Sequence, residues 1–251
     1  MPDFSDSTMP TSKPSTAARI SKKAVAVKPK ASRPLSSPDK VVEAISTGIL
    51  MRRFGPGHRL VEADLSSNYN VSRGTVREAL KKLAAQGVVV LNPHRGASIR
   101  PLSRREAEQL LLVLEVLCGL AARLAAENIV PGPLRERMKA ASDMLTRVHL
   151  ESGVEQFMAD RAAYYGVMLG IADNAELNRV MPLPQISLLR SQYHGFLRPK
   201  DIRDMRKEYG EISDAILQSD AVQAETRMCK HLRRTRDRLL AVEEEAFNQS
   251  F

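Results

Sequence analysis

The segment that most constrains the fold reads NVSRGTVREALKKLAAQGVVVLNPHRGASIR and spans residues 70–100. Ser72 is placed to cap a helix whose apolar residues recur at helical spacing, at Val76, Leu80 and Leu83. Gly87 suits the left-handed residue that ends such a helix. Two strand-like stretches, VVVL and ASIR, then flank NPHRG, a turn by composition. The pattern predicts a capped helix followed by a two-stranded wing.

The residues before this segment predict two further helices. SSPDKVVEAISTGILMRR begins with Ser37 as a cap and Pro38 in the first turn, and its Val and Ile residues share one face. FGPGHRL breaks that helix, and VEADLSSNY predicts a short amphipathic helix with Leu65 directed inward. Helix, helix, turn, helix and wing together are typical of a winged helix-turn-helix.

From Ser103 onward the sequence is helical almost throughout. The expected helices are 103–129, 133–150, 154–172, 174–197, 201–219 and 221–246. Pro182 and Pro184 should kink or interrupt the fourth of them. The predicted fold is therefore mainly α, with an N-terminal winged helix-turn-helix followed by an all-α bundle of six or seven helices. The middle of such a bundle can hold a small molecule.

The net charge of +9 is concentrated in the first hundred residues. Residues 1–36 and 37–102 each carry +5, whereas residues 103–251 carry −1. We expect a disordered basic tail over 1–36, a winged helix-turn-helix domain that faces a polyanion over 37–102 and a near-neutral all-helical domain over 103–246. The tail is either a solubilising segment or an arm that binds DNA phosphates without reading sequence.

The helix after Ser72 carries the residues that point to double-stranded DNA as a partner. Arg73 and Arg77 lie one turn apart near its N-terminus, where the helix dipole disfavours cations unless an anion is nearby. The second helix of a helix-turn-helix enters the major groove, where arginine binds guanine with two hydrogen bonds. Ser72 and Thr75 are short donors for phosphates or bases. The alternative is a solvated helix with incidental charges.

The predicted wing adds three candidate DNA contacts. Gly96 lets the backbone approach a phosphate or the minor groove closely, and His94 and Arg95 supply donors beside it. A single histidine in a turn is more often simply exposed, so His94 is the weakest of the three.

Other functional classes find little support in the sequence. There is no Ser/His/Asp arrangement, no Gly-rich phosphate loop after a strand and no HExxH motif, which argues against an enzyme. Cys118 and Cys229 are expected to be reduced and apolar in role. No run of 18 apolar residues and no signal peptide is evident, so we expect a cytoplasmic, nucleoid-associated protein that does not enter a membrane.

The sequence ILMRRFGPGHRLVEADLSSNYNVSRGTVREALKKLAAQGVVVLNPHRGASI resembles the DNA-binding half of GntR-type regulators. The helical remainder resembles the FCD effector domain of the FadR-like subfamily, with LEVLCGLAARLAAEN, ADN and CKHLRRTRDRLL in the expected order. This resemblance implies a homodimeric transcription factor that binds a palindromic operator and responds to a small, often carboxylate-bearing metabolite. Repression relieved by the ligand is the family's usual mode. The alternative function is a non-specific architectural DNA-binding protein.

Departures from the family pattern concern both halves. Ala63 occupies a position where the family has a DNA-contacting arginine. The commonest FCD domains hold a metal with one Asp and three His. Alignment through ADN places Arg161, Tyr165 and Tyr209 at three of those positions, and only His231 matches a ligand.

We therefore expect no metal cofactor and an organic anion in its place. Arg161 would bind a carboxylate, with hydrogen bonds from Tyr165, Tyr209 and His231 and a further contact from Arg190. Leu111, in place of an arginine found in many relatives, makes the mouth apolar and favours an aromatic or aliphatic acid. Three alternatives remain: solvated arginines at 161 and 190, tyrosines that only pack, or a metal site that uses Asp160 and His231 with His149 or His194.

Overall fold

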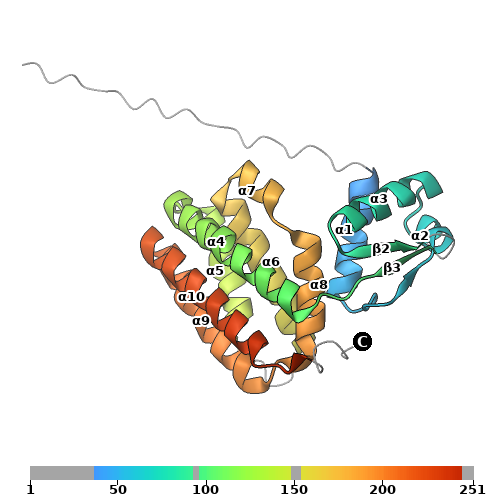
Figure 1. Cartoon of the computed structure of the whole chain (residues 1–251). Coiled ribbons are helices and arrows are strands. Elements are labelled where there is room, and N and C mark those ends of the chain that lie inside the picture. Colours follow the sequence, from blue (N-terminus) through green and yellow to red (C-terminus); the bar gives the residue numbers. More distant parts are fainter. Residues whose placement is uncertain (1–36, 93–95, 148–153, 245–251) are drawn as a thin grey trace, which may run out of the picture. The chain divides into compact units, whose positions relative to one another are not determined.

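The computed structural model describes residues 37–92, 96–147 and 154–244 (Figure 1). The N-terminal tail, residues 1–36, lies outside the described residues, as do His94, Arg95 and His149. The described chain has the predicted fold class, with a winged helix-turn-helix followed by a helical bundle.

The winged unit is built on three helices. Helix α1 (Ser37–Leu50) buries Val41, Ile45 and Ile49, and it packs against α3 (Arg73–Ala85). The short α2 (Glu62–Asn68) directs Leu65 into the same core and also packs against α3. These three helices confirm the predicted pattern, because each places its apolar residues on a single buried face.

A three-stranded antiparallel sheet completes this unit. Strand β3 (Gly96–Ile99) lies between β1 (Arg59–Leu60) and β2 (Val89–Asn92), with Leu91 opposite Ala97. Gly87 has a φ of +70° and ends α3, as predicted, since glycine adopts the left-handed region without a steric penalty. Strand β2 therefore begins within a few residues of the end of α3.

The bundle consists, within the described residues, of seven α-helices. They are α4 (Arg104–Asn128), α5 (Pro133–Thr146), α6 (Val154–Ala172), α7 (Ala175–Val180), α8 (Leu183–Tyr193), α9 (Pro199–Leu217) and α10 (Ala221–Leu240). Ser103 caps α4 in a reciprocal capping box with Glu106. Helix α4 packs against α6, α9 and most extensively α10, so it forms the centre of the bundle (Figure 1).

Three predicted helix ranges need correction. The expected helix over 133–150 ends at Thr146, because the backbone leaves α-helical geometry at Arg147, whose ψ is 127°. The expected helix over 174–197 is two helices, because the backbone leaves α-helical geometry at Met181 and Pro182 before α8 begins. This confirms the predicted interruption at the prolines. The expected helix over 221–246 ends at Leu240, before the acidic residues Glu243 and Glu244. Ala241 caps α10, and its backbone N–H donates to the Asp237 and Leu239 carbonyls, which closes the last turn.

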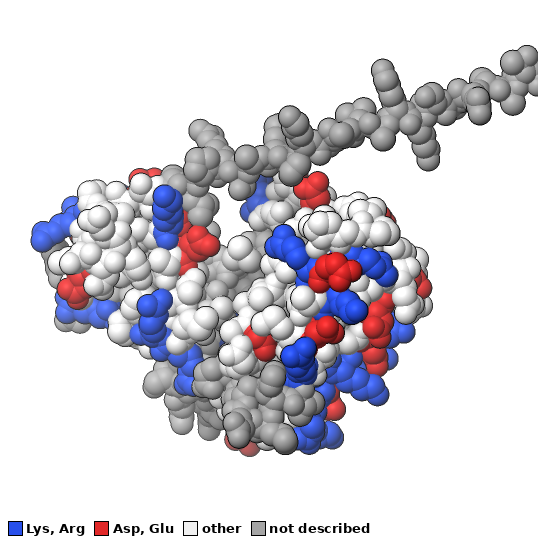
Figure 2. Space-filling view, turned by 180° about the vertical axis from the view of Figure 1, so that it is seen from behind, with Lys and Arg blue, Asp and Glu red and all other residues white. Residues whose placement is uncertain are grey.

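By length and composition alone, helix α4 is long and apolar enough to cross a membrane, and its most apolar 18-residue stretch has a mean hydropathy of 1.8. Of that stretch, 44% is buried inside the bundle. Its exposed side nevertheless carries Leu112, Val113 and Val116, which are 46%, 53% and 69% exposed. Elsewhere on the bundle, charges of both signs alternate over the face in Figure 2, in keeping with its near-neutral balance.

Candidate DNA interface and effector cavity

The N-terminus of α3 is organised by its cap. The Ser72 hydroxyl accepts a hydrogen bond from the Thr75 backbone N–H at 3.1 Å and lies 2.9 Å from the Thr75 hydroxyl. The side chains of Ser72 and Arg73 are exposed and that of Thr75 is half-buried. Because Val76 and Leu80 face the core, the opposite side of α3 is free to meet a ligand. The first turn is thus both fixed in position and accessible.

Arg77 is exposed but has a partner. Its Nε donates to the Glu62 carboxylate on α2 at 2.8 Å, and the Arg77 side chain remains 65% exposed. Such a surface ion pair contributes little to stability, so a phosphate or a guanine can compete for the guanidinium. Arg73 forms no ion pair within the described residues. Of the two predicted arginines, Arg73 is therefore the one already free to bind.

The described part of the wing includes Gly96, the first residue of β3. Its φ of +81° is a conformation that favours glycine, and a Cβ at this position would lie 4.0 Å from the Arg59 Nε. Arg59 is exposed on β1 beside the wing, and the sequence interpretation missed it as a candidate DNA contact. In the sequence, Arg59 is only a cation in GHRL at the start of a short strand. No motif there distinguishes a DNA-contacting arginine from a solvated one.

A cavity of about 660 Å³ lies among α1, α4, α6, α8 and α10. Most of its lining is aliphatic or sulfur-containing, including Leu114 and Cys118 on α4, Leu169 on α6, Met181 and Ile186. Burial raises the pKa of Cys118 to about 11, so this thiol is neutral and behaves as an apolar residue. Leu111 also lines the cavity, as predicted for an apolar mouth.

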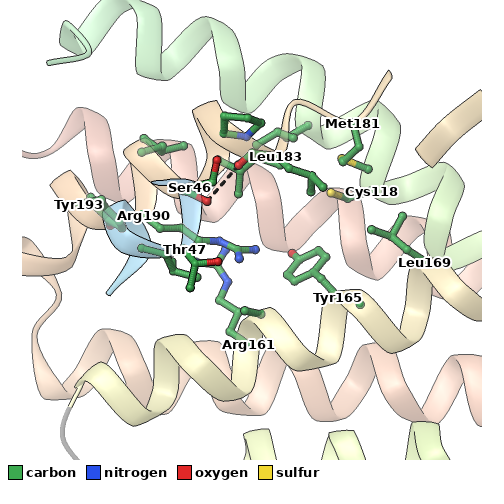
Figure 3. Close-up of a pocket in the computed structure, with 18 of the residues that line it drawn as sticks. Ser46, Thr47, Cys118, Arg161, Tyr165, Leu169, Met181, Leu183, Arg190 and Tyr193 are labelled. Atoms are coloured by element: carbon green, nitrogen blue, oxygen red, sulfur yellow. Dashed lines mark hydrogen bonds between the residues drawn. The ribbon is translucent and has the colours of Figure 1, made fainter. Parts of the chain in front are cut away.

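Two arginines provide the positive charge of this cavity. Figure 3 shows Arg161 of α6 and Arg190 of α8 with their guanidinium groups directed toward each other and toward Tyr165. Arg161 is only 5% exposed, which contradicts the alternative of a solvated helix residue. No carboxylate forms an ion pair with either arginine in the described part of the chain. Buried cations without a counter-ion are costly, and an anionic ligand would remove that cost.

Arg161 is held by the tyrosines behind it. Its Nε donates to the Tyr209 hydroxyl at 2.5 Å, and that hydroxyl donates onward to the Tyr165 hydroxyl at 3.3 Å. The Tyr165 hydroxyl in turn donates to the Met228 sulfur at 3.7 Å. Using Nε for this anchor leaves the fork of two terminal nitrogens for a carboxylate.

Arg190 has a different environment. Its guanidinium lies over the Tyr165 ring, 5.0 Å from the ring centroid. Burial and the neighbouring Arg161 cation lower the pKa of Arg190 to about 10. Both groups are therefore charged at neutral pH, and their mutual repulsion is relieved by an anion placed between them.

Tyr209 and His231 do not line the cavity, contrary to the expectation that they donate directly to the effector. Tyr209 is fully buried and its hydroxyl already holds Arg161. His231 stacks on Tyr209 with ring centroids 4.5 Å apart, and its Nδ1 donates to the Glu208 carboxylate at 2.6 Å. These residues support Arg161 from outside the cavity: Tyr209 holds its Nε and His231 packs on Tyr209, whereas α10 lines the cavity through Leu232, Thr235 and Leu239.

The metal alternative receives no support from the described residues. Asp160 accepts a hydrogen bond from Gln156, and His231 is engaged with Glu208. Across residues 37–92, 96–147 and 154–244, no group of three His, Cys, Asp or Glu side chains is placed to hold one ion. His194 instead contacts Arg52, through Nδ1 at 3.2 Å.

Comparison with known proteins assigns both halves of the chain to known families. The family of bacterial regulatory proteins named gntR matches residues 38–99, and the FCD domain matches residues 109–234. The regulator BphR of Paraburkholderia xenovorans is 26% identical over 200 residues, covering 75% of this chain and 80% of its own length. The repressor RspR of Escherichia coli is 23% identical over 195 residues, with coverages of 76% and 84%.

Solved structures agree on the fold. McbR/YncC of E. coli superimposes with a TM-score of 0.71 at 17% identity, covering 82% of this chain and 98% of the other. A winged helix-turn-helix joined to an all-helical bundle defines a DNA-binding transcriptional regulator. The chain belongs to the GntR family of bacterial transcriptional regulators and carries an FCD domain. Proteins of this family are regulators and not enzymes.

Proposed function

We propose that this regulator is a sequence-specific repressor, released from a palindromic operator by an organic acid bound in the bundle cavity. The observation that carries the DNA-binding half is the capped, exposed first turn of α3, with Arg73 unpaired among the described residues. Arg161 and Arg190, which form no ion pair with a carboxylate within the described residues, support the acid. The protein would act on chromosomal DNA in the cytoplasm.

On DNA, α3 enters the major groove and its first turn meets the base edges. Arg73 binds a guanine, while Arg77 exchanges Glu62 for a base or a phosphate. Ser72 and Thr75 position the helix on the backbone. Gly96 brings the wing to the adjacent groove and Arg59 adds a phosphate contact beside it, while His94 and Arg95, outside the described residues, stay candidate contacts from the sequence.

A palindromic operator requires a second copy of the chain. The exposed apolar side of α4, with Leu112, Val113 and Val116, is a surface that a partner bundle can bury. Two recognition helices about 34 Å apart then read successive major grooves on one side of the duplex. Sedimentation of the purified protein is expected to give a dimer, and Val116→Asp is expected to shift it toward monomer.

The effector is expected to be an acid with an apolar body. Its carboxylate lies between Arg161 and Arg190, and its body contacts the aliphatic lining. Tyr165 contributes its ring edge and hydroxyl at the boundary between the two regions. An aromatic or medium-length aliphatic acid satisfies both requirements better than a small hydroxy acid.

DNA selection from a random-sequence pool, followed by binding assays on the recovered fragment, tests the DNA-binding proposal. Arg73→Ala should lose about 1–3 kcal/mol of discrimination between the operator and random duplex. Arg137→Ala is the matched control, because it removes one exposed cation from α5 in the bundle. Equal losses in the two variants would contradict a reading role for α3.

The alternative, a non-specific architectural DNA-binding protein, is separated by the same experiment. Its signature is equal affinity for the operator and for random duplex, with a steep salt dependence that disappears when residues 1–36 are deleted. Recovery of a palindromic sequence excludes it.

A further inference from the structure

The cavity is not confined to the effector domain. Six of the residues that line it belong to α1 of the DNA-binding domain: Asp39, Val42, Glu43, Ser46, Thr47 and Leu50. Figure 3 shows Ser46 and Thr47 among the residues that line the cavity together with Arg161 and Arg190. One wall of the candidate ligand site is therefore a helix whose other side packs against α3.

The cavity has positive groups on one side and acidic groups on another. The positive groups are Arg161 and Arg190, which come from α6 and α8, whereas the acidic residues of the lining, Asp39 and Glu43, are both on α1. Asp39 is held by Lys82 at 2.9 Å, so it keeps its place on this wall. A carboxylate is favoured at the arginine pair and disfavoured at α1, and the uncharged body of a ligand is left to face α1.

The volume of the cavity indicates how large a ligand it can hold. A cavity of about 660 Å³ falls within the range of roughly 300–1,000 Å³ typical of sites for drug-sized ligands. An acid as small as acetate fills only the surroundings of the arginines. An acid with a longer body extends through the remaining space, which α1 bounds.

Helix α8 connects the arginine side of the cavity to the DNA-binding domain. It carries Arg190 and also packs against α1. The Gln192 side chain forms two hydrogen bonds with the Leu102 backbone, at 2.8 Å and 3.1 Å, and Gln185 donates to the Gln86 carbonyl at 2.9 Å. A ligand that touches both Arg190 and α1 thus contacts both sides of this junction.

We propose that α1 is part of the ligand site, and that Val42, Thr47 and Leu50 set the size of the acid that the protein accepts. This inference rests on the proposed function, since it assumes an acid anchored at Arg161 and Arg190. Its consequence is direct coupling: a bound acid favours one position of α1, which is the differential affinity that a ligand needs to alter DNA binding.

The test uses the full chain and a series of straight-chain monocarboxylates from acetate to decanoate, with binding measured by calorimetry. Thr47 is exposed at the edge of the cavity, so Thr47→Phe should fold and place a ring in the space next to α1. The variant should bind the longest acids about tenfold or more weakly while short acids bind as in the wild type. Leu50→Ala enlarges the same space and should shift the preference toward longer acids.

Lys40→Phe is the matched control, because it adds the same ring to α1 at an exposed position that does not line the cavity. It should leave the chain-length profile unchanged. If acids bind and lose affinity in Arg190→Gln, but Thr47→Phe and Leu50→Ala keep the wild-type profile, the role of α1 is overturned and the acid site stands. If no acid in the series binds the wild type, the acid site and the role of α1 are both rejected.

Discussion

At the scale of single residues, the cavity depends on which polar groups are used and which are free. The Nε of Arg161 donates a hydrogen bond to the Tyr209 hydroxyl. Within the described residues, the immediate partner of the Arg190 guanidinium is the Tyr165 ring. Outside the cavity, the Glu208 carboxylate accepts hydrogen bonds from His231, from Arg234 at 3.1 Å and from Arg238 at 2.8 Å. Arg234 and Arg238 thus have a carboxylate partner outside the cavity, whereas Arg161 and Arg190, which line the cavity, have none within the described residues.

His231 gives a prediction about stability and pH. Burial lowers the pKa of His231 to about 4 although its hydrogen bond to the Glu208 carboxylate raises it, and the Arg161 cation lowers it further. Because the unfolded chain gains this proton near pH 6.5 and the folded one only near pH 4, the free energy of unfolding should fall across that window. For this group alone the fall is on the order of 3 kcal/mol.

Glu208 acts in the same direction at lower pH. Despite burial, hydrogen bonds from His231 and Arg238 lower its pKa to about 2, so its contribution is lost as the pH falls from about 4.5 to 2. Denaturant unfolding of the wild type and His231→Gln from pH 7 to 4 separates the two groups. The variant should show a shallower decline, and His58→Gln, at an exposed histidine, should keep the wild-type slope. Identical slopes in all three proteins would contradict the assignment of a buried neutral His231.

The sequence predicted some of these residues and not others. Arg161 could be found because the family pattern fixes where a ligand should be and arginine is conspicuous there. The supporting position of Tyr209 and His231 could not, because helical spacing indicates which side of a helix is buried but not which layer of the bundle the side meets. The α1 wall was missed for a similar reason, since Ser46 and Thr47 read as ordinary residues of an amphipathic helix.

At the scale of elements, the central contact is that between α4 and α10. Gly119 makes this close approach possible, because a Cβ at that position would lie 2.6 Å from the Cys229 sulfur. The local patterns predicted both helices well, since each has a strong apolar periodicity and α4 a capping box. They did not predict which pair of helices would pack most closely.

A pair of glycine substitutions tests this contact. Gly119→Ala should lower stability by about 1–3 kcal/mol, because Cys229 has only one side-chain torsion with which to move away. Gly170→Ala is the matched control inside α6, where a Cβ meets no atom within 4 Å. It should raise stability by up to about 1 kcal/mol through helix propensity. Thermal unfolding measures both, and a stabilised Gly119→Ala would show that α4 and α10 do not meet as closely as described.

At the scale of the whole molecule, the proposed function joins two sites that the chain builds separately. The α3 face is fixed by a cap and a sheet, and the cavity is fixed by the packing of the bundle, yet α1 belongs to the surroundings of both. Coupling energies of about 1–3 kcal/mol, or 5- to 150-fold in affinity, are typical for such linked sites. Thermodynamic linkage is reciprocal. Bound operator must therefore lower the affinity for the acid by the same factor as bound acid lowers the affinity for the operator.

The most direct measurement is fluorescence anisotropy of the labelled operator fragment, titrated with octanoate in the presence of the wild type or Arg190→Gln. We expect octanoate to release the operator from the wild type, and we expect the variant to bind the operator equally well with and without the acid. Arg179→Gln, which removes an exposed arginine from α7, should respond like the wild type. If octanoate binds the wild type by calorimetry yet leaves operator affinity unchanged, the cavity does not control DNA binding by α3.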